Sequence, residues 1–259
     1  MVEVECMEKL TIIPLGTVSP YCKNEMNCPG FLIKYKDQNI LLDCGNGITR
    51  YLNFPNDLKN MSVIISHYHK DHYGDLGVLQ YASYVYHNLG KLEEPINIYL
   101  PKNDFNCSKE SIILNKESYA NYIDIEENQI YEIDDLKITF YNNHSHTIDS
   151  YMIKLEINDK KVVYTSDIGT TNLKGVVDFC SNADILICES SFLLEHNSNS
   201  KTHLNAYDAG IIAKSANVKK LVLTHFWPEE DKNIYLEEAK EFFSNIEVAI
   251  ENSKIDLFF

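Results

Sequence analysis

The feature that most constrains this chain is a dense group of histidines and acids between Ser66 and Leu76. It reads Ser-His-Tyr-His-Lys-Asp-His-Tyr-Gly-Asp-Leu and follows an apolar run typical of a buried strand. His67 and His69 are two residues apart, so on an extended segment their side chains point the same way. Asp71 and His72 follow in a turn and can face a second point nearby. The spacing predicts two metal ions, and imidazole with carboxylate favours zinc, with iron or manganese as alternatives.

Length and composition indicate one globular domain, 1–259, with a sizeable core, because 44% of the 259 residues are hydrophobic. No apolar run approaches the roughly 20 residues of a membrane span, and the first nine residues do not resemble a signal peptide. Seven scattered cysteines fit reduced thiols in a cytoplasmic protein. Whether Cys22 and Cys28 have a role, such as sharing a metal, stays open.

The acidic charge bears on partners. With 23 basic against 38 acidic residues, the net charge of −15 disfavours long nucleic acid, which is held largely by lysine and arginine. For most of the surface, the simpler reading is that the charge keeps the protein soluble. We expect a small-molecule substrate and no membrane partner. A homodimer is compatible with the sequence, which does not define the oligomeric state.

Short β-like runs alternate with amphipathic helical stretches, which predicts an α/β fold. We expect strands at 10–15, 31–35, 40–43, 63–66, 96–100, 152–156, 162–165, 185–188, 221–223, 248–250 and 255–258, and a hairpin over 130–141. We expect helices at 75–87, 108–122, 172–180, 206–216 and 234–243, with Ser108 and Asn205 as two of the N-caps. The loop 16–30, with prolines and flanking glycines, is expected to line a site.

Further candidate residues stand where predicted strands end, the edge at which α/β sheets usually place functional groups. Asp43 precedes glycines and is expected to hold a metal ligand by hydrogen bonding rather than to bind metal itself. Asp167 also follows a strand, and its two oxygens can each ligate one cation. Either His144 or His146 can be a ligand, and His225 ends a strand.

Together these motifs resemble the metallo-β-lactamase superfamily. The matches are Leu-Gly-Thr at 15–17, Leu-Leu-Asp-Cys-Gly at 41–45, the His-x-His-x-Asp-His box, Thr-Ser-Asp-Ile-Gly at 165–169 and Leu-Thr-His at 223–225. The resemblance implies a four-layer αββα sandwich with metals at one edge. It selects His146, because the sequence from 146 to 151 is similar to a ligand histidine followed by Pro-Ser-Tyr, with Asp149 replacing the proline. It assigns one metal to His67, His69 and His146, the other to Asp71, His72 and His225, and the bridge to Asp167.

The C-terminal part resembles the ribonuclease Z branch of this superfamily. Cys-Glu-Ser-Ser-Phe at 188–192 is similar to its Cys-Glu-Ala-Thr segment, and the stretch from His203 is similar to its second catalytic histidine region. The resemblance implies that Glu189 orients His203, which assists at the scissile phosphate. The long tRNA-clasping arm of that branch is missing, because only one tight strand pair separates His146 from Asp167. This absence disfavours tRNA 3′ processing.

The sequence therefore predicts a binuclear hydrolase, with zinc as the favoured metal, that cleaves a small phosphodiester. A hydroxide between the two cations would attack phosphorus, Asp71 would hold that nucleophile, and His203 would protonate the leaving oxygen. A carboxylic ester, thioester or lactone hydrolase on the same metals is the main alternative. Two further alternatives are iron redox chemistry, for which no flavin domain is present, and a non-catalytic binding module.

Overall fold

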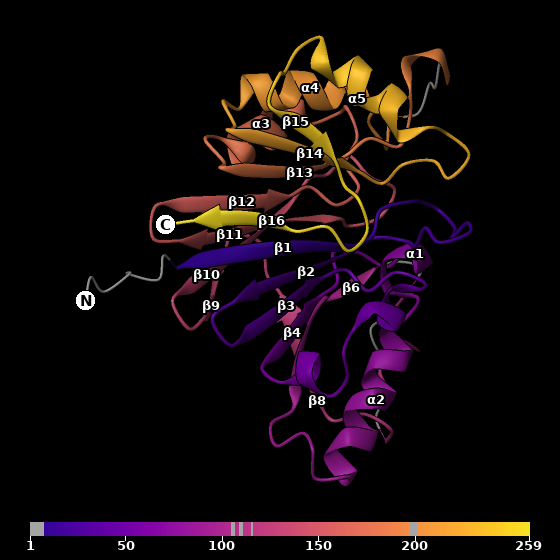
Figure 1. The fold of residues 1–259 in the computed structure, drawn as a ribbon, viewed down its shortest axis with the longest axis vertical. Coiled ribbons are helices and arrows are strands. Elements are labelled where there is room, and N and C mark those ends of the chain that lie inside the picture. The colour runs from indigo at the N-terminus through magenta and orange to yellow at the C-terminus, as the bar shows by residue number, and fades with distance from the viewer. Residues whose placement is uncertain (1–7, 105–106, 109–110, 115, 197–200) are drawn as a thin grey trace, which may run out of the picture.

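The strands form two seven-stranded sheets that face each other (Figure 1). This computed structural model describes residues 8–104, 107–108, 111–114, 116–196 and 201–259. The first sheet has the order β16-β1-β2-β3-β4-β5-β8, and the second has the order β15-β14-β13-β12-β11-β10-β9. The chain thus builds the first sheet mainly from its N-terminal half and the second from its C-terminal half.

The first sheet is antiparallel from β16 to β3 and parallel from β3 to β8. Its strands are β1 (Lys9–Gly16), β2 (Gly30–Tyr35), β3 (Gln38–Leu42), β4 (Met61–Ile64), β5 (Ile96–Pro101), β8 (Ala120–Ile125) and β16 (Ile255–Phe258). A short separate pair consists of β6 (Asn103–Asp104) and β7 (Cys107–Ser108).

The second sheet is antiparallel from β9 to β12 and parallel from β12 to β15. Its strands are β9 (Ile130–Ile133), β10 (Leu136–Asn142), β11 (Tyr151–Ile157), β12 (Lys160–Tyr164), β13 (Ile185–Glu189), β14 (Lys220–Thr224) and β15 (Ile246–Val248). The tight connection from β11 to β12 is the expected strand pair, and no longer arm intervenes between them.

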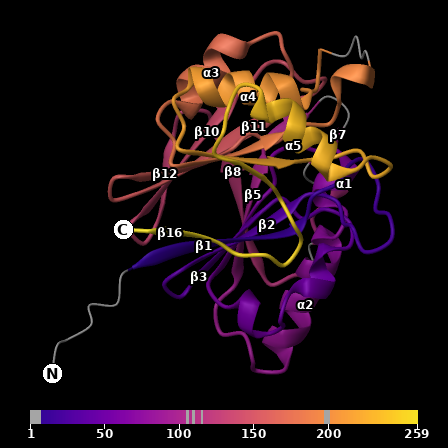
Figure 2. The same ribbon diagram turned by 45° about the horizontal axis from the view of Figure 1, so that its top comes forward.

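Helices cover the outer faces of both sheets. They are α1 (Lys70–Tyr73), α2 (Leu76–Asn88), α3 (Leu173–Cys180), α4 (Ala206–Ser215) and α5 (Lys232–Lys240), with short 3₁₀ helices η1 (Ile48–Tyr51), η2 (Asn56–Leu58) and η4 (Leu194–His196). In Figure 1, α2 lies beyond the first sheet and α3, α4 and α5 lie beyond the second; Figure 2 shows the same layering from a turned view. This arrangement confirms the predicted αββα sandwich.

The hydrophobic core divides according to these layers. Phe31 and Ile33 of the first sheet pack between the sheets with Phe140 and Tyr164 of the second, and all four are buried. In β10 the buried residues alternate with less buried ones, as expected for a strand with one face in the core. Full burial of such side chains contributes about 1.5–3 kcal/mol each. Separate apolar clusters fill the space under α2 and under α3 to α5.

The predicted helix over 108–122 is wrong. Ser108 ends β7 instead of capping a helix, residues 112–114 and 116–119 are irregular, and Ala120–Ile125 form β8, paired in parallel with β5. Side chains of α2 supply hydrogen bonds to the irregular backbone: Gln80 bonds the Ile112 carbonyl and the Leu114 amide, and Ser83 Oγ accepts from the Tyr119 amide. Tertiary pairing with β5 and α2 therefore overrides the local helical pattern.

The other predicted helices are confirmed within a few residues. Asn205 caps α4 as predicted, because its side-chain oxygen accepts a hydrogen bond from the Asp208 amide at 2.7 Å. In the described ranges of the chain, none of these helices has the length and apolar character needed to cross a membrane.

Candidate metal centre

The predicted site residues converge at one edge of the sandwich, between the two sheets. Parallel strands bring their carboxyl ends to the same edge, and the candidate residues follow those ends. Four of these residues follow β4 of the first sheet, and two of the four lie in α1. The other three follow β10, β12 and β14 of the second sheet. They are His67, His69, Asp71 and His72 on one side and His146, Asp167 and His225 on the other.

Four of these residues form a first cluster. His69 Nδ1 lies 3.1 Å from both His67 Nε2 and His146 Nε2. Asp167 Oδ2 lies 3.5 Å from His67 Nε2 and 3.8 Å from His146 Nε2. Nitrogen and oxygen atoms that each lie about 2 Å from one zinc ion are separated by distances of this size. The cluster can therefore hold one divalent cation.

A second cluster lies on the other side of Asp167. His72 Nε2 and His225 Nε2 are 3.2 Å apart, and Asp71 Oδ2 is 3.6 Å and 3.8 Å from them, respectively. Asp167 Oδ1 is 2.9 Å from His225 Nε2 and 3.2 Å from His72 Nε2. The two oxygens of Asp167 thus face different clusters, which is the placement expected of a bridging carboxylate.

Asp167 also provides the test of whether a cation fits. Its Oδ1 atom is buried and accepts no hydrogen bond from the described residues. Buried carboxylate oxygens without a partner are rare, because leaving one unsatisfied costs free energy. A cation between Asp167 and the two histidines of the second cluster would satisfy this oxygen, so the donor set fits a metal.

The pKa values of the buried histidines and carboxylates of the site show that the carboxylates favour positive charge beside them. Although burial disfavours the charged imidazole, Asp167 and Asp71 raise the pKa of His225 to about 10. Burial and the neighbouring charge of His72 instead lower the pKa of His67 to about 3. Asp167 is buried, yet His225, His72 and His67 hold its pKa well below the usual range. Without metal, protons on histidine balance the carboxylates, and a divalent cation can take over this role.

Four of the histidines have their outward-facing ring nitrogen fixed by a hydrogen bond. Each Nδ1 then carries a proton, which leaves Nε2 as the ring atom that can bind a cation. The acceptors are Ser66 Oγ at 3.0 Å for His67, Asp43 Oδ2 at 2.7 Å for His72, the Thr202 carbonyl at 3.0 Å for His146, and Ser191 Oγ at 2.8 Å for His225.

Asp43 has the position predicted for it, behind a histidine rather than in a cluster. Its Oδ2 accepts from His72 Nδ1, from Ser66 Oγ at 2.9 Å and from the Tyr164 hydroxyl at 2.8 Å, and its Oδ1 accepts from the Ser66 amide at 2.8 Å. Asp43 has a left-handed φ of 58°, and His225 has one of 65°. Such strained backbone persists where the surrounding contacts fix it and is common at functional sites.

Gly169 allows two segments of the site to touch. A Cβ atom on this residue would lie 1.7 Å from the Lys201 carbonyl oxygen, so any side chain would clash with backbone. A hydrogen bond from the Thr170 amide to that same oxygen stabilises the close approach. It places the next residue, Thr202, where its carbonyl accepts from His146.

Glu189 and His203 form a hydrogen-bonded pair beside the two clusters. His203 Nδ1 lies 3.0 Å from Glu189 Oε1 and 4.0 Å from Asp167 Oδ2. Glu189 is buried, whereas His203 is partly exposed. Although burial lowers the pKa of His203, Glu189 raises it above the ordinary value overall. His203 is therefore suited to hold a proton at the mouth of the site.

A pocket of about 300 Å³ opens at this mouth. It is lined by Ser19, Pro20, Tyr21, Ser191, Phe192, His203, His225 and Trp227. Three of the lining residues come from the loop 16–30, which was predicted to line a site. None of the described residues that line the pocket is lysine or arginine.

Two candidates from the sequence lie outside this arrangement. His144 is exposed, so of the two alternatives the structure brings His146 into the first cluster. Cys22 and Cys28 have sulfur atoms 3.7 Å apart, but in the described ranges they belong to no group of three possible metal ligands.

Several hydroxyl groups of the site had not been singled out from the sequence. The hydroxyls of Ser66 and Ser191 each hold a histidine, and Ser19 Oγ donates to Asp71 Oδ2 at 2.8 Å. A signal was available, because Ser66 and Ser191 stand within two residues of a predicted site residue at a strand end.

Two other features are separate from the centre. Glu195, His196 and Glu230 lie close together, but His196 Nδ1 accepts from the Leu193 amide at 3.1 Å, so Nε2 carries the proton and donates to Glu230.

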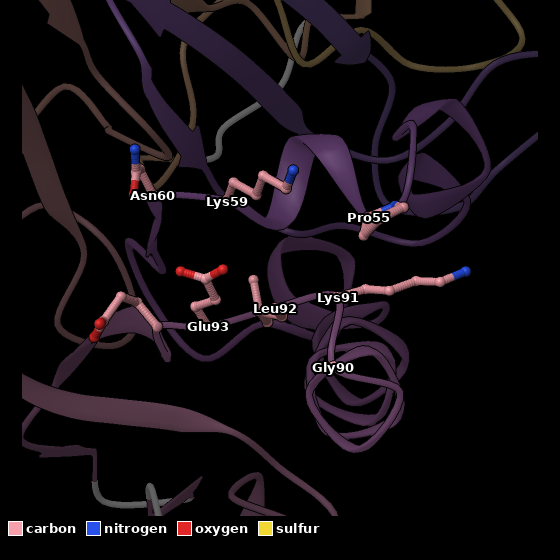
Figure 3. Close-up of a pocket in the computed structure, with 8 residues that line it drawn as sticks. Pro55, Lys59, Asn60, Gly90, Lys91, Leu92 and Glu93 are labelled. Atoms are coloured by element: carbon pink, nitrogen blue, oxygen red, sulfur yellow. The ribbon is translucent and has the colours of Figure 1, made fainter.

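Figure 3 shows a second depression, of about 450 Å³, between Pro55–Asn60 and the segment after α2, where Lys59 and Glu93 project from opposite walls. It contains none of the predicted site residues.

Comparison with known proteins agrees with this fold and site. The chain is 31% identical over 197 residues to the probable metallo-hydrolase YhfI of Bacillus subtilis, covering 76% of this chain and 78% of that protein. The crystal structure of YhfI matches with a TM-score of 0.88 at 28% identity, covering 96% of this chain and 100% of YhfI. Ribonuclease Z of Saccharolobus solfataricus is 30% identical over an alignment of 288 positions, gaps included, which covers 92% of this chain and 95% of that protein. Human tRNase Z, short form, shares the fold with a TM-score of 0.74 at 19% identity, covering 95% and 98%.

The fold, the clustered ligands and these relatives define a metal-dependent hydrolase of the metallo-β-lactamase fold, in a ribonuclease Z-like branch without the tRNA-clasping arm. Within this class, residues 10–248 match the family described as Anti-Pycsar protein Apyc1, and the chain belongs to that family.

Proposed function

We propose that this protein is a binuclear hydrolase that cleaves a small phosphodiester. The observation that carries the proposal is the Glu189–His203 pair at the mouth of the two clusters, with His203 Nδ1 4.0 Å from the shared carboxylate of Asp167. Attack on phosphorus develops negative charge and requires a proton for the leaving oxygen. A positively charged histidine beside the metal site serves both needs.

The two clusters support two divalent cations, with zinc favoured by the imidazole and carboxylate ligands. His67, His69 and His146 would hold one, Asp71, His72 and His225 the other, and Asp167 would bridge them. When bound, such a pair supplies Lewis acidity and lowers the pKa of water to near 7.

The remaining roles belong to the protein. Asp71 Oδ2 accepts from Ser19 Oγ at 2.8 Å, which fixes the carboxylate beside a residue that lines the pocket, and there Asp71 can orient the attacking water and take its proton. Glu189 favours the protonated form of His203, because its buried carboxylate raises the pKa of that imidazole. His203 can then stabilise the charge on the phosphate and protonate the leaving oxygen.

Size and charge favour a small substrate over long nucleic acid. The pocket of about 300 Å³ is lined by aromatic residues, two histidines, a proline and two serines, and by no described lysine or arginine. A polynucleotide backbone would also meet a chain with a net charge of −15. Between His146 and Asp167 the chain forms only the tight β11–β12 hairpin, which offers no arm for a tRNA.

The test is a hydrolysis screen of the metal-loaded protein against phosphodiesters, cyclic nucleotides, lactones, thioesters and a tRNA precursor. We expect turnover of a small phosphodiester above all other classes. His203→Ala should reduce that turnover by about 10²-fold or more, the size typical of a general acid. His144→Asn is the matched control, because it removes an exposed imidazole outside the clusters and asparagine tolerates its left-handed φ of 53°.

Two outcomes would contradict the proposal. A preference for a carboxylic ester over every phosphodiester would assign the site to acyl transfer. Unchanged phosphodiester turnover in His203→Ala would show that the leaving oxygen does not depend on this histidine.

A further inference from the structure

The hydroxyl of Ser191 lies at the centre of the polar groups beside the second cluster. Ser191 Oγ is 2.7 Å from Glu189 Oε2, 2.8 Å from His225 Nδ1 and 3.3 Å from His203 Nδ1. It thus contacts the carboxylate that holds His203 and, at the same time, a histidine of the second cluster.

The single hydrogen of the Ser191 hydroxyl determines which groups donate and which accept in these hydrogen bonds. A serine hydroxyl has one hydrogen and two lone pairs, and its best acceptor here is the buried carboxylate of Glu189. Ser191 therefore donates to Glu189 and must accept from His225. His225 then carries a proton on Nδ1, which leaves Nε2, 2.9 Å from Asp167 Oδ1 and 3.2 Å from His72 Nε2, as the ring atom available to the second cation.

Glu189 can contact His203 and Ser191 at the same time, because both of its carboxylate oxygens take part in hydrogen bonds. Its Oε1 accepts from the Ile168 amide at 2.9 Å and bonds His203, whereas its Oε2 accepts from the Ser191 hydroxyl and from the Leu204 amide at 3.3 Å. One oxygen thus serves His203 and the other serves His225 through Ser191.

We propose that Ser191 is a positioning residue that fixes the tautomer of His225 for the second cation and joins that cation to the Glu189–His203 pair. Without the hydroxyl, the Nδ1 proton of His225 is left without an acceptor in a buried site. The ring then also has access to the tautomer with the proton on Nε2, which blocks the ligand atom. This inference rests on the binuclear assignment of the proposed function but not on its substrate.

The experiment compares Ser191→Ala, Ser191→Thr and Ser190→Ala. Metal-free protein is titrated with zinc against a chromophoric chelator, which gives stoichiometry and affinity without any substrate. Loss of an outer hydrogen bond to a metal-bound histidine typically weakens affinity by about 10–100-fold. We expect Ser191→Ala to bind one zinc ion normally and the second with such a loss. Ser191→Thr, which keeps the hydroxyl, should stay within about threefold of the parent protein.

Ser190→Ala is the control for nonspecific damage. The Ser190 hydroxyl is buried in the neighbouring position but donates to the Thr224 carbonyl at 3.1 Å, so it supports the same strands without contacting a cluster. It should bind both ions with unchanged affinity. Normal affinity for both ions in Ser191→Ala, or an equal loss in Ser190→Ala or Ser191→Thr, would overturn the inference.

The result can be separated from the fate of the proposed function. If no phosphodiester is hydrolysed but Ser191→Ala still loses the second zinc ion, the substrate proposal fails and the role of Ser191 stands. A parent protein that binds a single zinc ion would overturn the premise of two sites, and the inference with it.

Discussion

Replacing Asp43 by asparagine should destabilise the metal-free protein by about 3 kcal/mol. The carboxylate accepts four hydrogen bonds in a fully buried position, three of them on Oδ2. If the asparagine oxygen replaces Oδ2, its amide group faces the Ser66 amide, and that buried donor is left unsatisfied at a cost of about 1–3 kcal/mol. The other three bonds lose their charge assistance, about 1 kcal/mol each. Relief from burying a charge offsets part of this sum.

The assay is urea unfolding of chelator-treated protein followed by circular dichroism. With an m value of about 3 kcal/mol/M for a chain of this size, the midpoint should fall by about 1 M. Asp135→Asn serves as the control, because this exposed carboxylate bonds Lys36 and Tyr35 at the surface and should shift the free energy of unfolding by no more than about 0.5 kcal/mol. Equal midpoints for Asp43→Asn and the parent protein would refute the reasoning that this carboxylate organises the network around His72.

Three further predictions concern a close glycine contact, a helix cap and the accessibility of cysteines. Gly169→Ala should destabilise the protein by about 3 kcal/mol in the same assay, since its Cβ would overlap the Lys201 carbonyl oxygen; a neutral effect would mean that the two segments can separate freely. Asn205→Ala should cost about 1 kcal/mol through loss of the α4 cap, whereas Asn205→Asp should retain most of it. Exposed Cys22 should be alkylated before buried Cys180 in the native state, as read by mass spectrometry, and Cys180 should resist because burial raises its pKa to about 12. Equal labelling of both would contradict the burial of Cys180.

The site was predictable because its ligands follow strand ends that the sequence marks clearly. His67, His69 and His72 stand together after an apolar run, and Asp167 and His225 each end a short run of buried residues. Which residues share one cation is a matter of three-dimensional distance, and here the resemblance to a known superfamily guided the assignment.

The failures have a common physical cause. The stretch 108–122 has helical spacing, but its hydrogen bonds come from β5 and from Gln80 and Ser83 of α2, which are distant in sequence. In the same way, the role of Ser191 depends on His225, 34 residues away. Local pattern carries no information about such partners, so these features required the structure.

The pairing of the last strand with the first constrains when this protein can become complete. In the first sheet, β16 pairs with β1, with Lys9 opposite Phe258 and Ile12 opposite Ile255. At about 5–20 residues per second, the ribosome needs roughly 10–50 s to proceed from β1 to β16. During that time the outer edge of β1 is open, and for the earlier part of it His67 and His69 also lack His146, which comes from the second half of the chain. The nascent protein therefore exposes an unpaired strand edge for longer than it exposes an incomplete first cluster.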